Sequence, residues 1–486
     1  MERSPDTSAE STSTGGTAAV PAPDHEPSIE RVGTLVYDKT GLRRLFGWLL
    51  WGDFASSIVD RSAGLVVQAV LNSFNITNTA YALIGTVSSV FGFVVGPIVS
   101  YKSDRHRGPR GRRRPFLLYA VPISGALMLT MSIAPSAGLW LDGVLGAHSP
   151  GRWLHLVKPD CLTPSAFNMV LLLFGASILI QSFVGTIVGA TFGAFINDVV
   201  PHTVIGRFYG WWRVISLGVG AIFNIFAFSV AAAHYRILFV VLSVVYALGF
   251  FLSIYKVKEG EYPPVPANEG GRSPFVAGLR ATKTYLVECY SKPFYLFLFL
   301  AGILAGFGAS AIFSYPIFFA RSLHWSDSAF GICNGLGLLV GACISPIAGW
   351  LAQRYHPLRV SMLTLVVHAA VVFAGGILIH DGLTFGIGYS TANILQMFYN
   401  TANVTTGNRL IPKEKFAMIG SAGSNLGILM GMVYTPFLGW MLDKTHSHYQ
   451  YTYIVSGFCD LGAIAAYMVV YMYFKKHGGD EHYVAP

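Results

Sequence analysis

The sequence predicts an all-α integral membrane protein whose twelve transmembrane helices form two pseudo-symmetric six-helix bundles. Of the 486 residues, 53% are hydrophobic and 12% are charged, whereas about a quarter of the residues in soluble domains are charged. The apolar residues gather in long runs separated by short polar segments, and the mean hydropathy is +0.52. Two sequence patterns also recur at constant offsets between the halves of the chain. Together these observations exclude a soluble globule.

Each apolar run is near or above the roughly 20 residues with which a helix crosses a bilayer. The runs follow a tail over 1–40 that is rich in Ser, Thr, Pro and Gly, has no apolar signal-peptide core and is expected to be disordered. The five cysteines are too scattered to predict disulfides. The predicted spans are 45–71, 82–101, 115–134, 167–196, 208–232, 237–257, 294–319, 330–352, 360–379, 383–407, 417–442 and 453–474.

The spacing of these spans predicts two bundles and the segments that join them. The N-terminal bundle is expected over 41–257, with an external loop over 135–166, and the C-terminal bundle over 293–475. A cytoplasmic linker over 258–292, containing an interfacial helix, is expected to connect them. A short cytoplasmic tail over 476–486 ends the chain.

The distribution of basic residues predicts the orientation, because Lys and Arg remain preferentially on the cytoplasmic side. Of the 33 Lys and Arg, 27 lie on the same side as both termini, 5 lie on the other side and Arg61 lies within the first span. Both termini are therefore expected in the cytoplasm, beneath a bacterial inner membrane or a plasma membrane. This asymmetry also accounts for the net charge of +9. The expected partner is the lipid bilayer, and no motif indicates a nucleic acid.

Two repeated patterns indicate an internal duplication. A Pro-Ile-x6-Arg pattern begins at Pro97 and again at Pro346, an offset of 249 residues. An Asn-x3-Pro pattern begins at Asn197 and again at Asn408, an offset of 211 residues. The chain is therefore predicted to contain two copies of a six-helix unit in parallel orientation.

The segment that follows the second span carries a family resemblance. It contains Gly96-Pro97-Ile98, Asp104-Arg105 and Gly111-Arg112-Arg113-Arg114-Pro115-Phe116, and it resembles the loop between helices 2 and 3 of major facilitator transporters. Its ending is similar to that of the plant sucrose transporters and the glycoside-pentoside-hexuronide:cation symporters. Gly52-Asp53-Phe54-Ala55 resembles the start of helix 1 in the melibiose permease branch, and Arg213 falls where that branch has an arginine. The resemblance implies the major facilitator fold and a sugar or glycoside as substrate.

The coupling ion is predicted from departures from that branch. Gly92 and Gly96 stand where the melibiose branch has paired acids, and Val188 stands where it has the helix 4 acid that binds sugar. The arginine of the sucrose transporters falls near Gly193. A sodium site of that type is incomplete, so we expect a proton as the coupling ion and regard sodium as less favoured. No cofactor or metal is expected, and the absence of HExxH, CxxC, GxSxG and Walker A motifs indicates that the protein is not an enzyme.

Two acids lie within the first span, at Asp53 and Asp60. A charge at membrane depth costs on the order of 3 kcal/mol or more unless it is paired or wetted, which makes each acid a candidate site. Seven residues apart, they share one helix face, and two close acids at low dielectric favour uptake of a proton by one of them. We expect Asp60 to couple the proton, with Asp53 close to it, and Asp53 to bind substrate while Arg213 balances its charge. The alternative is a static pair of Asp60 with Arg61, or of either acid with Arg213.

Four amides form a stripe on the tenth span, at Asn393, Gln396, Asn400 and Asn403. Their spacing places them on one helix face. Amides offer both the donors and the acceptors that a hydroxyl-rich ligand requires. Because the tenth helix lines the central cavity of the fold that the resemblance implies, we expect these amides to bind substrate. The alternative is that they hydrogen-bond to neighbouring helices.

Trp212 and Arg213 open the fifth span and are expected to contact substrate, since indoles stack on sugar rings and arginine offers a fork of donors. Anchoring in the membrane interface is the alternative for Trp212. His368 and Asp460, on the ninth and twelfth spans, are expected to be structural.

The loop after the second span contains a predicted conformational latch. In one state its acid would pair with arginines or with a helix N-terminus, and its alternative role is only to set the topology. The latch residues are Asp104, Arg105, Arg112 and Arg113.

These features predict a secondary active transporter that imports a sugar or glycoside by alternating access and is coupled to protons. A first alternative is an exporter of amphipathic small molecules, which would have a more apolar cavity than the four amides indicate. A second alternative is a membrane sensor or scaffold that does not transport, or an unrecognised membrane enzyme.

Overall fold

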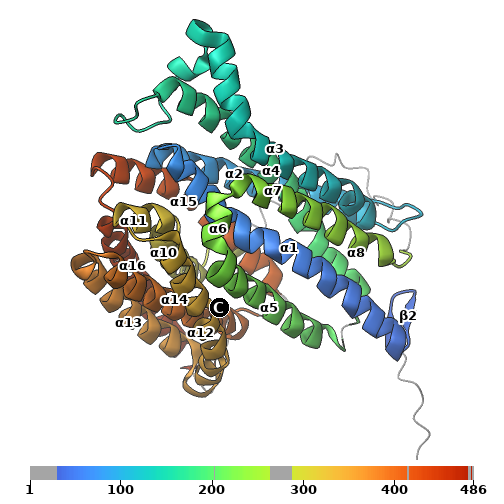
Figure 1. Cartoon of the computed structure of the whole chain (residues 1–486). Coiled ribbons are helices and arrows are strands. Elements are labelled where there is room, and N and C mark those ends of the chain that lie inside the picture. The colour runs from blue at the N-terminus through green and yellow to red at the C-terminus, as the bar shows by residue number, and fades with distance from the viewer. Residues whose placement is uncertain (1–29, 202, 263–286, 413–414, 480–482, 484–486) are drawn as a thin grey trace, which may run out of the picture.

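The computed structural model describes residues 30–201, 203–262, 287–412 and 415–479 together with Tyr483. Within these residues the protein is almost entirely helical, and its helices form two bundles, drawn from blue to green for the first half of the chain and from yellow to red for the second (Figure 1). The structure confirms the predicted all-α membrane fold.

The first bundle follows a short antiparallel hairpin of β1 (Glu30–Val32) and β2 (Leu35–Tyr37). Two of its spans contain a π-helical segment between α-helical parts. Its elements are α1 (Lys39–Ser73), α2 (Asn78–Arg105), α3 (Arg114–Leu145), α4 (Pro164–Val199), α5 (Ile205–Ile222), η3 (Phe223–Ala227), α6 (Phe228–Ala233), α7 (Tyr235–Val244), η4 (Val245–Phe250) and α8 (Phe251–Lys256).

The second bundle contains a bent span, because Pro316 cannot continue the hydrogen bonds of the preceding helix. Its helices are α10 (Pro293–Phe313), α11 (Pro316–Ser322), α12 (Asp327–Tyr355), α13 (Pro357–Leu378), α14 (Gly382–Leu410), α15 (Phe416–Lys444) and α16 (Gln450–Lys476).

The described residues account for all twelve predicted spans. Eleven helical segments are long and apolar enough to cross a membrane. The tenth predicted span, α14, has 29 residues, which is also enough. Its many amides and threonines lower its hydropathy, and its four amides are the side chains predicted to bind substrate.

The structure corrects two predicted boundaries. The described part of the expected tail over 1–40 is not disordered, since residues 30–37 form the hairpin and α1 begins at Lys39. The external loop expected over 135–166 is shorter, because α3 continues to Leu145 and two short 3-10 turns follow, η1 (Gly146–His148) and η2 (Pro150–Arg152). Figure 1 shows this part of α3 and α4 projecting beyond the other helices. The expected interfacial helix falls largely on 263–286, outside the described residues.

Asn168 explains why the segment after α3 has a defined course. Its side-chain oxygen accepts from the backbone N–H groups of Leu156 and Val157, at 3.0 and 3.1 Å. Its Nδ2 donates to the carbonyl oxygens of Gly151 and Leu154, at 2.9 and 2.6 Å. The buried amide thus replaces the backbone partners that the loop lacks, which the hydropathy of the sequence does not reveal.

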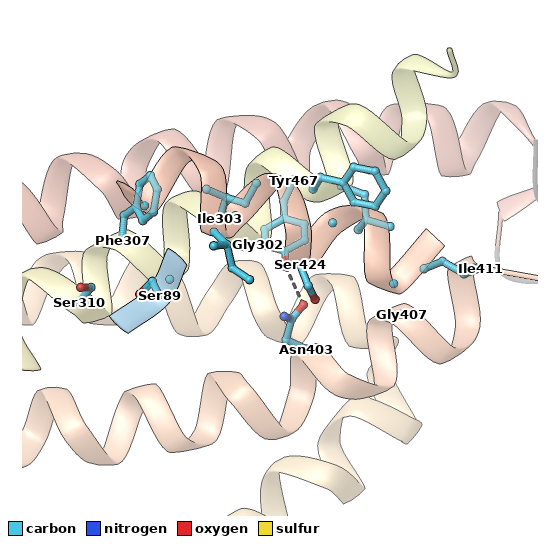
Figure 2. A pocket seen from close by; sticks show the side chains of 18 of the residues that line it. Ser89, Gly302, Ile303, Phe307, Ser310, Asn403, Gly407, Ile411, Ser424 and Tyr467 are labelled. Atoms are coloured by element: carbon cyan, nitrogen blue, oxygen red, sulfur yellow. Dashed lines mark hydrogen bonds between the residues drawn. The ribbon is translucent and has the colours of Figure 1, made fainter. Parts of the chain in front are cut away.

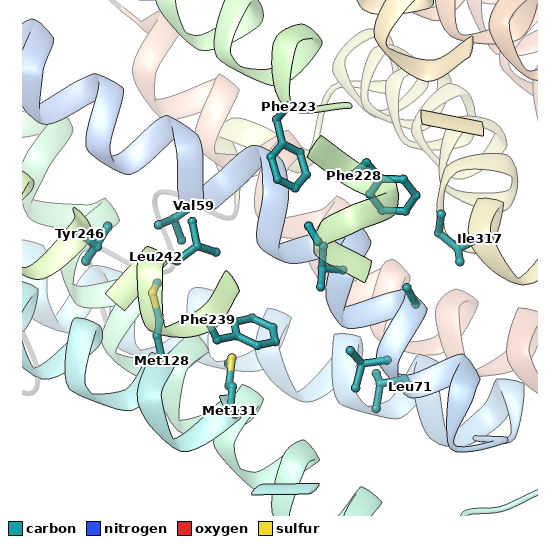
Figure 3. Packing of buried hydrophobic residues seen from close by; sticks show 14 of the residues in the cluster. Val59, Leu71, Met128, Met131, Phe223, Phe228, Phe239, Leu242, Tyr246 and Ile317 are labelled. Carbon is teal, nitrogen blue, oxygen red and sulfur yellow. The ribbon is translucent and has the colours of Figure 1, made fainter. Parts of the chain in front are cut away.

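The apolar core differs between the two ends of the molecule. We call the end where residues 106–113 connect α2 to α3 the basic end, and the opposite end the far end. One cluster runs through the first bundle and continues at the far end into α11, α14, α15 and α16 (Figure 3 shows part of it, from α1, α3, the α5–α8 segment and α11). A separate cluster fills the second bundle toward the basic end. The two bundles therefore share a core at the far end.

Candidate functional site

Asp443, near the end of α15, joins the two bundles at the far end. Its carboxylate accepts from the backbone N–H groups of Asn78 and Thr79, both at 2.8 Å, from the Thr79 hydroxyl at 2.6 Å and from the Asn78 amide at 2.9 Å. Asn78 and Thr79 begin α2, so the acid also lies at the positive end of that helix dipole. The hydroxyls of Tyr315 and Tyr449 donate to the Asn78 backbone and side-chain oxygens, at 3.1 and 2.9 Å.

Arg321 provides a second connection at the far end. From α11, its guanidinium donates to the Ala69 carbonyl at 2.7 Å and to the Asn72 and Ser73 side chains at 3.4 and 3.2 Å, in the last turns of α1. It also forms an ion pair with Asp327 at 2.7 Å. A cation at the carbonyl end of a helix is favourable. Asp443 and Arg321 thus each place a charge at the helix terminus of opposite polarity.

A chain of three amides connects the bundles closer to the middle of the molecule than Asp443 and Arg321. Asn334 on α12 donates to the Asn224 oxygen at 2.9 Å, and Asn393 on α14 donates to the Asn334 oxygen at 3.5 Å. Asn224 lies in the π-helical segment η3, a feature that often marks functional positions. Gly331 and Gly335 let α12 approach, since a Cβ at either position would clash with the facing segment.

All these hydrogen bonds between the bundles lie in the far half of the molecule, and the shared apolar cluster lies there too. At the basic end, the ion pairs between described residues join partners within one bundle. The structure is therefore closed at the far end and open between the bundles at the basic end.

A cavity of about 570 Å³ extends from mid-depth toward the basic end. One lining residue, Ser89 on α2, comes from the first bundle, and the others come from the second (Figure 2). The Tyr467 hydroxyl donates to the Asn403 oxygen at 2.7 Å inside it. The polar side chains in its wall are all neutral: Ser89, Ser310, Asn403, Ser424, Thr435 and Tyr467.

Glycines make room for this cavity, and they are a sequence signal that the predicted site missed. Gly420, Gly423, Gly427 and Gly431 recur at intervals of three or four residues on α15 and all line the cavity. That spacing places them on one helix face. A stripe of glycines on one face of a span, with Ser424 beside it, indicates in the sequence that this face borders a cavity.

The predicted amide stripe divides into three parts in the structure. Asn403 lines the cavity, whereas Asn393 joins the amide chain between the bundles. Gln396 is buried and donates to the Asn400 oxygen at 3.2 Å, and Asn400 is exposed. The structure thus shows interhelical hydrogen bonding at both ends of the stripe, and the cavity at the Asn403 end.

The two acids of α1 differ in their surroundings. Asp53 is 1% exposed; one oxygen accepts from Ser57 at 3.0 Å, and the other has no partner among the described residues. Asp60 is exposed. The described residues show no ion pair between Asp60 and Arg61, whose guanidinium instead donates to Ser216 on α5 at 3.2 Å. The static pair considered from the sequence is therefore absent from this conformation.

Trp212 and Arg213 do not lie against these acids. Trp212 packs on Phe192 of α4, with ring centroids 5.6 Å apart, and on Phe208. Arg213 is exposed, and no ion pair with Asp53 is found in the described part of the chain. The charge balance expected between Asp53 and Arg213 is thus not present in this state.

The predicted latch residues form a network within the first bundle. Arg113 pairs with Asp104 and with Asp198, both at 2.7 Å, and Arg112 pairs with Asp198 at 2.6 Å. Arg105 lies over the Tyr101 ring at 4.2 Å. Asp198, at the end of α4, was not singled out from the sequence. In this open state the latch therefore holds α2, α3 and α4 together.

A buried histidine–aspartate pair lies inside the second bundle, between α13 and α16. His368 Nδ1 and Asp460 Oδ2 are 2.6 Å apart, and the side chains are 1% and 0% exposed. Gly308 on α10 admits the acid, since a Cβ there would lie 2.9 Å from Asp460 Oδ1. The pair lies within the packed bundle, in agreement with the structural role expected for both residues.

Replacing Asp460 with Leu is expected to lower the stability of the protein by about 3 kcal/mol or more, because the partner imidazole is left buried without its acid. The double variant His368→Leu with Asp460→Leu removes both polar groups and should recover much of the loss. Thermal unfolding of the purified variants measures both effects. Equal unfolding midpoints for the wild type and the single variant would contradict the structural role.

Two six-helix bundles that are joined at one end, with a cavity lined by the second bundle and by Ser89 of the first, are the architecture of secondary transporters that expose a central cavity to one side of the membrane at a time. The profile of the Major Facilitator Superfamily matches residues 49–427, and the chain belongs to this family. No curated protein sequence matches the chain significantly.

Solved transporter structures share the fold. A bacterial homologue of the human lysosomal transporter Spinster, inward-facing and unoccupied, is similar with a TM-score of 0.59 at 14% identity, covering 90% of this chain and 97% of that one. A bacterial homologue of the iron transporter ferroportin, inward-facing, gives 0.58 at 16% identity, covering 88% and 99%. A bacterial homologue of ferroportin in the outward-facing state gives 0.53 at 16% identity, covering 88% and 99%.

Proposed function

We propose that the protein imports a sugar or glycoside into the cytoplasm by proton-coupled alternating access, and that the structure is its inward-open state. The observation that carries this proposal is the cavity, open at the basic end beneath a far end closed by Asp443 and Arg321. The excess of Lys and Arg at the basic end supports a cytoplasmic position for it and for both termini.

The chemistry of the cavity wall supports a glycoside in particular. Its hydroxyl and amide groups are neutral donors and acceptors suited to sugar hydroxyls. The same wall also contains six large apolar side chains, which suit the aglycone of a glycoside: Leu298, Phe299, Ile303, Phe307, Ile411 and Ile428. They also favour a second candidate, an amphipathic cargo without a sugar.

Thermal unfolding with candidate ligands separates these substrates. The protein should be held in lipid nanodiscs or in a detergent without a sugar head, since alkyl glycosides would occupy the cavity themselves. Free sugars, aryl and alkyl glycosides, uronates and amphiphiles without a sugar are then compared. We expect glycosides to raise the unfolding midpoint most, because a ligand stabilises the state that binds it. Stabilisation by the amphiphiles alone would support the second candidate.

Replacing Asn403 with Leu is expected to weaken binding of the stabilising ligand by about tenfold, the effect of losing one hydrogen bond or slightly more. Asn403 lines the cavity, and an apolar residue is tolerated in a spanning helix. Tyr399→Phe is the matched control, because the Tyr399 hydroxyl meets Tyr467 at 3.0 Å from outside the cavity wall. Unchanged affinity with reduced stability in Asn403→Leu would show that this amide is structural.

Uptake is expected to respond to a pH gradient and to be indifferent to sodium. Gly92 and Gly96 supply no carboxylate for a sodium site on α2, and hard cations require oxygen ligands. Initial uptake rates in proteoliposomes, measured at fixed pH with sodium or with choline, test this. A strong stimulation by sodium would contradict the proton as the coupling ion.

A further inference from the structure

A groove of about 600 Å³ lies at the basic end of the first bundle, between the start of α3 and the end of α8. Four of its lining side chains are cationic: Arg110, Arg114, Lys256 and Lys258. None of its lining residues in the described chain is acidic. Like charges that converge on one groove repel one another, so the folded protein gains stability from an anion bound among them.

The arginines around the start of α3 point in two directions, some toward the inside of the bundle and one toward the groove. Arg112 and Arg113 turn inward to Asp198, whereas Arg114 donates through Nε to the Ile254 carbonyl oxygen at 3.0 Å, beside the groove. The turn depends on Gly111, which has a φ of +94° and no space for a Cβ against the Glu259 side chain.

The acid nearest to the groove is already engaged. The Glu259 carboxylate accepts from the backbone N–H groups of Arg113 and Arg114, both at 3.0 Å, and thereby caps α3. In the described part of the chain, Arg110, Lys256 and Lys258 form no ion pair. Glu259 partly offsets the charge of Arg114, and with four cations and no acid among its described lining residues the groove keeps a net positive charge.

The rest of the groove is apolar and lies deeper in the membrane. Leu118 and Tyr119 lie about one helix turn beyond Arg114, and Phe251 lies more than one turn before Lys256. Tyr119 and Tyr255 are 69% and 57% exposed, so the groove faces outward. Cations at the helix ends with an apolar wall below them match the order of headgroup and acyl chain in a phospholipid.

We propose that this groove binds an anionic phospholipid, with its phosphate among the four cations and an acyl chain along Leu118, Tyr119 and Phe251. The site is separate from the transport cavity, and it does not depend on the identity of the transported substrate.

Native mass spectrometry and thermal unfolding test the site on the intact protein. We expect phosphatidylglycerol to bind the wild type and to raise its unfolding midpoint more than phosphatidylcholine does. The variant Arg110→Gln, Lys256→Gln and Lys258→Gln should bind phosphatidylglycerol at least about tenfold more weakly. Arg114 is left in place because it also contacts a helix carbonyl.

The matched control removes the same charge outside the groove, by Arg43→Gln, Arg44→Gln and Lys102→Gln at exposed positions of the same end. It should retain the preference for phosphatidylglycerol. An equal loss in both triple variants, or equal binding of the two lipids by the wild type, would overturn the proposal. Competition by glycerol phosphate as strong as that by the lipid would show that the groove binds a free phosphate instead.

The apolar wall has its own test. Tyr119→Ser with Phe251→Ser keeps all four cations and should weaken phosphatidylglycerol binding while leaving any binding of glycerol phosphate unchanged. Unaltered lipid binding in this variant would contradict the placement of the acyl chain.

Discussion

Replacing Asp443 with Ala is expected to open the far end of the protein. The carboxylate accepts four hydrogen bonds from Asn78 and Thr79 in the closed arrangement, and each hydrogen bond to a charged group is worth about 1.5–3 kcal/mol. The donors at the start of α2 reach water once the bundles separate, so the variant loses the closed arrangement without leaving them unsatisfied. A loss of even one such bond shifts the ratio of the two states by at least about tenfold.

The shift can be measured by labelling a cysteine at position 438. Leu438 is 1% exposed and belongs to the cluster that both bundles share at the far end. With the five native cysteines replaced, a water-soluble maleimide should react with Leu438→Cys at least about tenfold faster when Asp443→Ala is added.

Asp142→Ala is the matched control, because Asp142 also lies toward the far end but accepts from Ser165, within its own bundle, at 2.7 Å. Leu438→Cys should be labelled at the same rate with Asp142→Ala as without it. Equal rates in all three proteins would show that Asp443 does not hold the far end closed.

Replacing Asp60 with Asn is expected to abolish accumulation of substrate against a gradient while preserving binding and the exchange of internal for external substrate. Asparagine resembles the protonated acid, so the carrier can still change conformation but cannot release a proton. A symporter needs an acid that is reached from one side and then from the other. Asp60 is exposed in this conformation.

Asp53→Asn provides the comparison on the same helix face. We expect this variant to lose substrate binding itself, and uptake, exchange and ligand-induced stabilisation measured side by side distinguish the two defects. Since Asp53 is 1% exposed here, its contact with substrate requires α1 to rearrange. Normal accumulation by Asp60→Asn would place the proton site elsewhere, and normal binding by Asp53→Asn would make that acid a packing residue.

Hydropathy and charge sufficed to predict the fold because they depend on the membrane and not on particular contacts. Long apolar runs have to become helices in a bilayer, where each backbone polar group needs an internal partner. Neither property reveals the role of Asn168, whose four hydrogen bonds order a segment that composition assigned to a loop. Pro316 likewise bends a run that is continuously apolar in the sequence.

The site was harder to predict. Helical periodicity shows which face of its helix a residue lies on, but it does not show which other helix packs against that face. Asn393 and Asn403 share a stripe, yet one meets α12 and the other meets Tyr467 of α16. Asp443 was not singled out, since its role depends on the start of α2, 364 residues earlier in the chain. Contacts between bundles are set by tertiary packing, which one sequence does not encode locally.

Proton movement driven by substrate in proteoliposomes tests the central claim most directly. A glycoside that stabilises the purified protein is added outside vesicles containing the protein, and the external pH is followed with and without an uncoupler. We predict a transient external alkalinisation in the wild type that is absent in Asp60→Asn, because protons enter together with the substrate. Uptake of the same glycoside without any change in pH, or the absence of uptake by the folded wild type, would contradict a proton-coupled importer.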